Sequence, residues 1–283
     1  MFENLSTIQF ALMVTLLSTI FVCFIVGLII TIKAKQRFRL FIIIALTLNS
    51  LLLLALIING AIETYQSGGG EFWSEFGLYL CTVAIIAVIV LITFLLGKKI
   101  DCNHTKSIVY GALCIALGFA LSYVRLFEMP QGGSVTLASL LPLMLYSYAF
   151  GIRKGVFIGI IYGLLQFIQA PWFYHPMQFL LDYPIAFCAV GLSGLLRELK
   201  LFDKIKPLQF ALSAIIAIII RYLSHVISGI FVFGSGDPEN YSAVAWSFLY
   251  NSFAFVDLAI ALVAGCALTA SKSFYKLLNK APL

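Results

Sequence analysis

The stretch at residues 178–192, QFLLDYPIAFCAVGL, places one carboxylate, Asp182, in a segment whose other residues are uncharged and mostly apolar. With its flanks, the segment is long enough to lie in the hydrocarbon of a bilayer. A charged side chain at that depth costs at least about 2.5–3.5 kcal/mol, so we expect it to have a partner or a function. A cation bound beside Asp182 would meet that demand.

The composition of the chain indicates an all-α polytopic membrane protein. Its 283 residues are 62% hydrophobic and only 11% Asp, Glu, Lys or Arg, whereas a soluble domain has about 25% charged residues. About nine stretches are long enough to cross about 30 Å of hydrocarbon. They run over 9–32, 40–62, 78–97, 107–124, 135–150, 155–170, 177–196, 207–230 and 243–270. The two shortest, 135–150 and 155–170, could be partly re-entrant, so a count of eight or ten helices stays open.

The basic residues predict the orientation of these helices. All but two of the 18 Lys and Arg residues fall in five clusters between or after the spans. The clusters are Lys33 to Arg39, Lys98 to Lys106, Arg153 with Lys154, Arg197 to Lys206, and Lys272 to Lys280. With nine spans all five share one side, which the positive-inside rule makes cytoplasmic. We therefore predict a multi-pass protein of the cell membrane with its N-terminus outside and its C-terminus in the cytoplasm. The net charge of +6 is then a topology signal, and no nucleic-acid partner is expected.

The motifs of several enzyme classes are missing from the sequence. The six cysteines form no close-spaced pair, so no disulfide framework or zinc site is predicted. The chain has no GxxxxGK[ST] phosphate loop, no HExxH and no GxSxG. We predict that the protein is not an enzyme, that it has no catalytic or metal-ligating residues, and that it carries no cofactor.

The chain divides near residue 100. Residues 1–100 hold three predicted helices with few polar groups, and a role in packing, partner contact or sensing is equally open for them. In residues 107–283, polar side chains recur inside the spans. Two ladders of small residues, each with a spacing of four, also fall in this second part. They are Ala112, Ala116 and Ala120, and Gly151, Gly155, Gly159 and Gly163. Such faces let another helix approach closely, and we assign the glycine ladder to internal packing.

Five polar side chains are expected at membrane depth: Asp182, Arg221, His225, Asn251 and Asp257. Arg221 and His225 are four residues apart, on one face of a helix. Arg221 could form a structural ion pair with Asp257 or with Asp182. Trp246, Tyr250 and Asn251 lie within little more than a turn. Aromatic rings attract cations, so rings, an amide and a carboxylate together suit a flat organic cation, although an interfacial aromatic belt is the alternative.

Residues 107–283 resemble the thiamine-specific substrate-binding subunits (S components) of energy-coupling factor (ECF) vitamin transporters. Five motifs carry the resemblance: ALCIALGFA at 112–120, IRKG at 152–155, HPMQFLLDYPIAFCAVGLSGLLRE at 175–198, RYLSHVISGIFVF at 221–233 and WSFLYN at 246–251. Their order and spacing together are more specific than any one of them. The resemblance implies a six-helix core, here preceded by three extra N-terminal helices, and a membrane-embedded subunit that takes up thiamine as part of an ATP-driven transporter.

The resemblance also implies the roles of individual residues. The expected substrate-binding residues are Asp182, Tyr183, His225, Phe233, Trp246, Asn251 and Trp172. The alanine ladder, Ala112, Ala116 and Ala120, would contact the transmembrane coupling subunit, and the ATPase subunits would be separate chains. The ligand would enter from the outer face under a lid formed by residues 126–135.

Some positions depart from the family pattern. Asp182 stands where the pattern leads us to expect Glu, Phe233 and Trp246 where it has Trp and Tyr, and Gly133 stands near the place of a lid tryptophan. These changes keep an aromatic, anionic cage but leave the ligand open between thiamine, a thiamine precursor and another small vitamin. A membrane sensor, in which residues 1–100 pass a ligand signal to a partner, is the alternative from another functional class.

Overall fold

A computed structural model of the protein describes residues 15, 71–97, 104–129, 132–233, 242–274 and 276. The predicted spans 9–32 and 40–62 lie outside the described residues. The chain forms two units, Met1–Leu95 and Leu96–Leu283, which are described separately. In the first unit, α3 (Glu71–Leu95) contains most of the predicted span 78–97, and its residues Gly77–Leu95 are apolar and long enough to cross a membrane.

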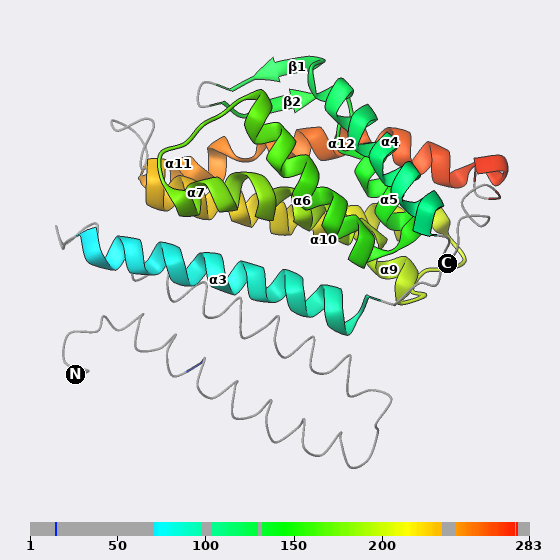
Figure 1. Cartoon of the computed structure of the whole chain (residues 1–283), viewed down its shortest axis with the longest axis horizontal. Coiled ribbons are helices and arrows are strands. Elements are labelled where there is room, and N and C mark those ends of the chain that lie inside the picture. Colours follow the sequence, from blue (N-terminus) through cyan, green and yellow to red (C-terminus); the bar gives the residue numbers. More distant parts are fainter. Residues whose placement is uncertain are drawn as a thin grey trace, which may run out of the picture. The chain divides into compact units, whose positions relative to one another are not determined.

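In its described residues, the second unit consists mainly of helices, with one pair of short strands (Figure 1). Its elements are α4 (His104–Ser122), β1 (Arg125–Glu128), β2 (Ser134–Thr136), α5 (Leu141–Phe150), α6 (Ile152–Gln169), α7 (Pro176–Leu180), η1 (Leu181–Ile185), α8 (Ala186–Val190), η2 (Gly191–Gly194), α9 (Leu195–Glu198), α10 (Lys206–Ser228), η3 (Gly229–Phe233), α11 (Ala243–Tyr250) and α12 (Phe253–Ala270). Within the described residues of this unit, five stretches are long and apolar enough to span a bilayer: Thr105–Ser122, Ile152–Gln169, Pro176–Glu198, Lys206–Phe233 and Ala243–Ala270. They agree with five of the six spans predicted after residue 100.

The sixth predicted span, 135–150, was wrong as a continuous helix. Only Leu141–Phe150 is helical, and these ten residues cover about 15 Å, half of the hydrocarbon thickness. Pro142, near the start of α5, lacks a backbone N–H and suits the first helical turn. The residues before it are extended in β2 and buried, with Val135 and Thr136 each 5% exposed. Residues 135–150 therefore combine a short buried strand with a short helix.

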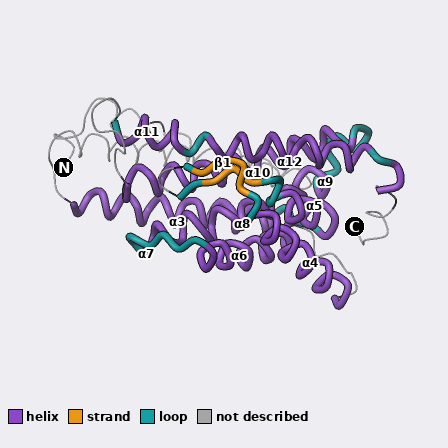
Figure 2. The backbone as a smooth tube through the Cα atoms, turned by 90° about the horizontal axis from the view of Figure 1, so that it is seen from above, coloured by secondary structure: helices purple, strands orange, loops and turns teal. Residues whose placement is uncertain are grey.

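The two strands form an antiparallel hairpin that the all-α prediction omitted. Arg125 pairs with Thr136 and Glu128 with Ser134, and a bulge interrupts the register between Arg125 and Phe127. Figure 2 shows the backbone from above, with this hairpin drawn in orange in front of the helices. It occupies the segment that the resemblance assigns to a lid.

The glycine ladder packs inside the unit, as predicted, with one exception. A Cβ atom on Gly159 would lie 2.4 Å from the Phe187 carbonyl oxygen, and one on Gly163 would lie 2.5 Å from that of Tyr183. The glycines therefore let α6 touch the backbone of η1 and α8. Gly151 does not belong to this face: it lies in the turn between α5 and α6 with φ of 90°, a conformation that favours glycine.

The contact between α6 and α8 leads to a prediction for Gly159→Ala. The added methyl group would meet backbone atoms that cannot move aside, and overpacking of this kind costs about 1–3 kcal/mol. We expect a lower midpoint of thermal unfolding for the detergent-solubilised protein. Gly111→Ala is the matched control, because its Cβ would meet only side-chain atoms, no closer than 3.3 Å. Equal midpoints for the two variants would contradict this account of α6 packing.

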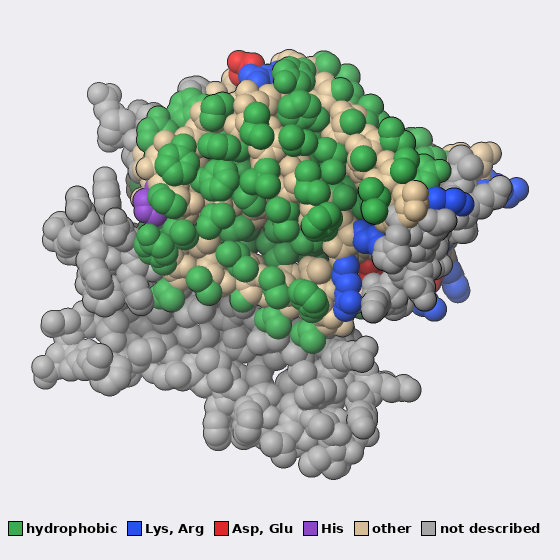
Figure 3. Space-filling view, viewed as in Figure 1, with side chains coloured by type: hydrophobic (Ala, Val, Ile, Leu, Met, Phe, Trp, Pro, Cys, Tyr) green, Lys and Arg blue, Asp and Glu red, His purple; other side chains and the backbone are tan. Residues whose placement is uncertain are grey.

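Basic side chains gather at one end of the second unit (Figure 3). They come from the start of α4, the start of α6, the segment before α10 and the segment after α12, which chain order places on the same side. These residues are Lys106, Arg153, Lys154, Lys200, Lys204, Lys272 and Lys276. In the segment before α10, hydrogen bonds from Gln209 and Lys206 hold the pKa of the Asp203 carboxyl below its usual range. We call the end of the unit that carries these Lys and Arg side chains the basic end.

Candidate ligand-binding site

Two π-helical turns, η1 and η3, position the side chains around one cavity. Pro184 lies inside η1; it cannot donate a backbone hydrogen bond and crowds the preceding turn, which favours a wider turn. The Ser224 hydroxyl donates to the carbonyl of Leu181, at the start of η1, at 2.6 Å. The Ser247 hydroxyl of α11 donates to the carbonyl of Val226 at 2.8 Å, and Val226 lies in α10 just before η3. Hydroxyl groups therefore satisfy backbone oxygens that water cannot reach at this depth.

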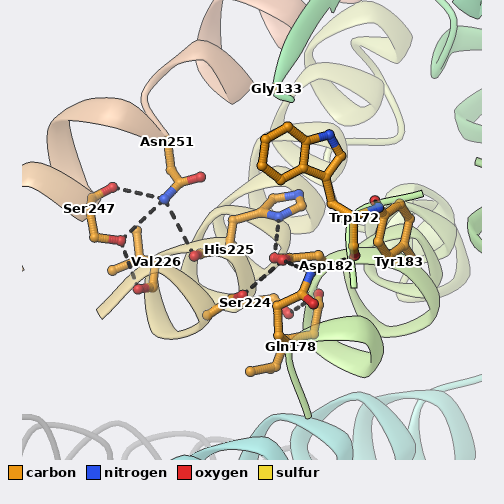
Figure 4. Close-up of polar contacts among 12 residues, drawn as sticks. Gly133, Trp172, Gln178, Asp182, Tyr183, Ser224, His225, Val226, Ser247 and Asn251 are labelled. Carbon is orange, nitrogen blue, oxygen red and sulfur yellow. Dashed lines mark hydrogen bonds and ion pairs between the residues drawn. The ribbon is translucent and has the colours of Figure 1, made fainter. Parts of the chain in front are cut away.

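Asp182, on η1, lies at the centre of a hydrogen-bond network (Figure 4). Its Oδ2 accepts bonds from Gln178 Nε2 and from the Ser228 hydroxyl, each at 2.8 Å. Its Oδ1 lies 3.0 Å from His225 Nδ1. Gln178 is also bonded to the backbone oxygen of Trp172, so the carboxylate is tied to α7, α10 and the loop before α7. These partners hold the carboxylate in one orientation.

No Lys or Arg lies within ion-pair distance of Asp182 among the residues that the structure describes. Of the two pairings considered for Arg221, the structure has the one with Asp257, whose Oδ2 lies 3.6 Å from Arg221 Nη1. Asp257 and Arg221 thus offset each other. When the His225 ring is neutral, no side chain among His225, Arg221 and Asp257 offsets the negative charge of Asp182.

A cavity of about 150 Å³ opens beside this network. All seven residues predicted to bind the substrate line it: Asp182, Tyr183, His225, Phe233, Trp246, Asn251 and Trp172. The structure brings them together from η1, α10, η3, α11, the turn after α11 and the loop before α7. Their lining of one cavity does not test which ligand they bind, and that role stays a prediction.

The polar groups of Tyr183 and Asn251 also fasten the walls of the cavity. The Tyr183 hydroxyl donates to the Ala170 carbonyl at 2.9 Å and accepts from the Trp172 amide at 3.1 Å, which fixes the Trp172 loop. Asn251 Nδ2 donates to the carbonyls of His225 and Ser247, so α10 and α11 are joined beside the cavity. In Figure 4 the Asn251 side-chain oxygen points away from these bonds. His225 Nε2 is buried without a hydrogen-bond partner among the described residues, so one ring nitrogen remains for a ligand.

The hairpin rests on the rim of the cavity. The Gly133 amide donates to the Tyr250 hydroxyl at 3.2 Å. A Cβ atom on Gly132 would lie 2.7 Å from Trp172 Nε1, and one on Gly133 would lie 2.8 Å from the Phe253 ring. Phe253 therefore occupies the space that a lid side chain at Gly133 would need. Packing of this kind explains why glycine suits this position.

Several lining residues were missed by the sequence analysis. Gln178 precedes Asp182 by four residues, a spacing that places both on one helix face and could have revealed it. Ser122, Gln166 and Gln169 form a second polar cluster, in which the Ser122 hydroxyl bonds Gln169 at 2.9 Å and Gln166 at 3.0 Å. They come from α4 and α6, and no spacing within either helix indicates that they share a cavity with Asp182.

Comparisons with known proteins indicate the family to which this chain belongs. Residues 108–276 match the family described as Thiamine transporter protein (Thia_YuaJ). The thiamine transporter ThiT of Bacillus subtilis (strain 168) is 38% identical over 132 residues, which are 44% of this chain and 68% of that protein. The thiamine transporter ThiT of Lacticaseibacillus paracasei is 26% identical over 186 residues, 61% of this chain and 92% of that protein.

A solved structure of ThiT from Listeria monocytogenes has the same fold. It superposes with a TM-score of 0.53 at 19% sequence identity, covering 62% of this chain and 97% of the solved one. At that identity the similarity concerns the fold alone. The family match, in contrast, covers more than half of the chain and includes every residue that lines the cavity. This chain therefore belongs to the Thiamine transporter protein family.

Proposed function

We propose that this multi-pass membrane protein is the thiamine-binding S component of an ATP-driven, ECF-type transporter. The observation that carries the proposal is the Asp182 carboxylate, which faces an aromatic cavity without a Lys or Arg partner among the described residues. Thiamine carries a fixed positive charge on its thiazolium ring. A buried carboxylate and aromatic faces both attract such a cation, the rings by about 2 kcal/mol when desolvated. The family consists of transporters, and the protein is accordingly not an enzyme.

The proposed roles follow the geometry of the cavity. Asp182 supplies the counter-charge for the thiazolium, and His225, Phe233 and Trp246 stack on the ligand's rings. Trp172 closes the cavity from the outer loop. Tyr183 and Asn251 have part of their polar groups engaged in fixing the walls, so they hold the cavity in shape as well as contacting the ligand. The hairpin above them is the lid.

The transport step needs partners that are separate chains. Ala112, Ala116 and Ala120 are exposed along α4, and small side chains allow another helix to approach closely. This alanine face is the proposed contact with the transmembrane coupling subunit, and ATPase subunits would supply the energy. The basic end is the proposed cytoplasmic side, with the N-terminus outside and the lid facing out. Residues 1–100 form an extension with an open role.

Titration of the purified protein with thiamine tests the proposed ligand. Trp172 and Trp246 both line the cavity, so a bound thiazolium should quench their fluorescence. The decrease in fluorescence should level off as the thiamine concentration rises. We expect Trp246→Phe to remove part of the change in fluorescence. Competition by the separate pyrimidine and thiazole halves then shows which part of the ligand is recognised. An absence of quenching at saturating thiamine, or tight binding of one half in preference to thiamine, would contradict the proposal.

A further inference from the structure

Gln178 on α7 is a buried side chain, 1% exposed, and every polar group of its amide forms a hydrogen bond (Figure 4). Its Nε2 donates to Asp182 Oδ2 at 2.8 Å and to the backbone oxygen of Trp172 at 3.2 Å. Its Oε1 accepts from the backbone amide of Tyr174 at 3.2 Å. A primary amide has two N–H donors. One donor therefore holds the carboxylate, while the other donor and the oxygen hold the loop before α7.

The loop before α7, residues 170–175, has no regular secondary structure, so side chains decide where it lies. Among the described residues, two side chains bond its backbone. The Tyr183 hydroxyl bonds two backbone groups near the start of the loop. Gln178 bonds the carbonyl of Trp172 and the amide two residues later. Both side chains belong to the same short segment as Asp182, so the loop is fastened next to the carboxylate.

The aromatic side chains of this loop form part of the cavity mouth. Trp172 lines the cavity, and its Nε1 would lie 2.7 Å from a Cβ atom on Gly132, in the turn of the hairpin. The ring of Tyr174 meets the ring of Phe233 on η3, with the two centres 5.4 Å apart. The position of the loop therefore decides how one ring meets the hairpin and another meets η3.

The bonds of Gln178 connect the carboxylate to the mouth in both directions. A cation that holds Asp182 in its present position also holds the amide bonded to it, and that amide holds the loop. Linked equilibria are reciprocal, so a loop in this position favours the same placement of the carboxylate. Tyr174 is 64% exposed, so water can bond the loop backbone if Gln178 is removed. Such an exchange costs little free energy, and the loop would be held less firmly without loss of the fold.

We propose that Gln178 is a positioning residue, which couples ligand binding at Asp182 to closure of the cavity mouth by the loop before α7. The inference rests on the proposed function, since it takes thiamine as the cation that Asp182 faces. Gln178 acts through the carboxylate and the loop. Its removal should therefore shorten the time for which the ligand stays bound, because a loosely held loop lets the ligand leave sooner.

The first test replaces Gln178 by Met, which has a similar length and lacks the amide. Loss of a hydrogen bond to a charged group has an effect of about tenfold or more. We expect thiamine to dissociate from full-length Gln178→Met faster than from the wild type by about that factor, while the association rate changes by about threefold or less. Stopped-flow fluorescence measures both rates. The fraction of protein that binds thiamine should equal that of the wild type. An unchanged dissociation rate would overturn the inference.

A second measurement follows the loop itself. The chain has three tryptophans, and replacement of Trp73 and Trp246 by Phe leaves Trp172 as the reporter. In this background Gln178→Met should increase quenching of Trp172 by acrylamide in the ligand-free protein. Bound thiamine should then protect Trp172 less than it does when Gln178 is present. Equal quenching with and without Gln178 would show that the amide does not hold the loop.

Gln209→Met is the matched control. Gln209 is also a buried glutamine, 0% exposed, and is bonded to the Tyr148 hydroxyl and the Leu201 carbonyl, but it does not line the cavity. We expect this variant to unfold at a lower temperature and to release thiamine at the wild-type rate. If Gln178 only supported the fold, Gln178→Met would behave in the same way, and that result would overturn the inference.

Failure of the proposed function gives a different result. If the wild type binds no thiamine, the function and the inference fail together. If it binds thiamine but the dissociation rate or the quenching of Trp172 does not respond to Gln178→Met, only the inference fails. Should Gln178→Met not fold, Gln178→Asn decides. It keeps an amide at the buried position but is one methylene shorter, which separates it from Asp182 or from the loop, so faster dissociation is expected there as well.

Discussion

Replacement of Asp182 by Asn is expected to weaken thiamine binding by about 30- to 1,000-fold, which corresponds to about 2–4 kcal/mol. The substitution removes the negative charge that would face the thiazolium. It also places an amide N–H₂ among groups that now donate to the carboxylate, Gln178 Nε2 and the Ser228 hydroxyl. Both effects act on the cavity wall, and the protein should still insert into the membrane. Isothermal titration of the purified variant, compared with its yield in membranes, measures both.

Two further substitutions separate charge from geometry. Asp182→Glu keeps the charge but moves the carboxylate one methylene away from its present partners, so we expect a smaller loss than for Asp182→Asn. Asp203→Asn makes the same change of charge outside the cavity, at the segment before α10, and should leave the affinity unchanged. Wild-type affinity in Asp182→Asn would remove Asp182 from the proposed site.

Replacement of Ala116 by Trp is expected to abolish thiamine uptake while leaving thiamine binding unchanged. Ala116 is exposed on α4 and does not line the cavity. A bulky ring in the middle of the alanine face would keep a partner helix from the close approach that small residues allow. Uptake is measured with labelled thiamine in cells that contain the coupling and ATPase subunits, and it should be lost. Binding is measured as the dissociation constant of the purified variant, and it should equal that of the wild type.

Val263→Trp provides the control for this experiment. Val263 is 76% exposed on α12, on another helix than the alanine face, and a tryptophan there should neither block uptake nor alter binding. Co-purification of the coupling subunit should be lost in Ala116→Trp and kept in Val263→Trp. Normal uptake by Ala116→Trp would show that the alanine face is not the coupling surface.

The candidate site could be predicted to a large extent from single residues. Asp182, Arg221, His225, Asn251 and Asp257 are conspicuous because charged and polar groups are costly at membrane depth. A resemblance to a known family then indicated which aromatic residues accompany them. Which carboxylate pairs with Arg221 could not be predicted, because Asp182 and Asp257 are both far from it in sequence and the choice depends on the packing of α10 against α12.

The hairpin and the short helix α5 escaped prediction for a related reason. Hydropathy over 135–150 is that of a membrane helix, yet the Thr136 amide is satisfied by Asp257 at 3.1 Å instead of by a helical carbonyl. An extended strand at this depth is stable because a carboxylate from a helix 121 residues away in sequence accepts its hydrogen bonds. No local pattern contains that information.

By itself, the sequence determined that the protein lies in a membrane. It also determined the bounds of five of the spans after residue 100. Finally, it showed that an acid, a histidine and several aromatic rings must be accommodated inside those spans. Burial of apolar length and the cost of buried charge act on each segment separately, so they can be recognised one segment at a time. The tertiary structure added the π-turns that aim Asp182 and Phe233 into one cavity, the partners of each buried charge, and the hairpin that rests on the rim. These depend on contacts between helices, where the hydrogen bonds that no water can supply must come from side chains distant in sequence.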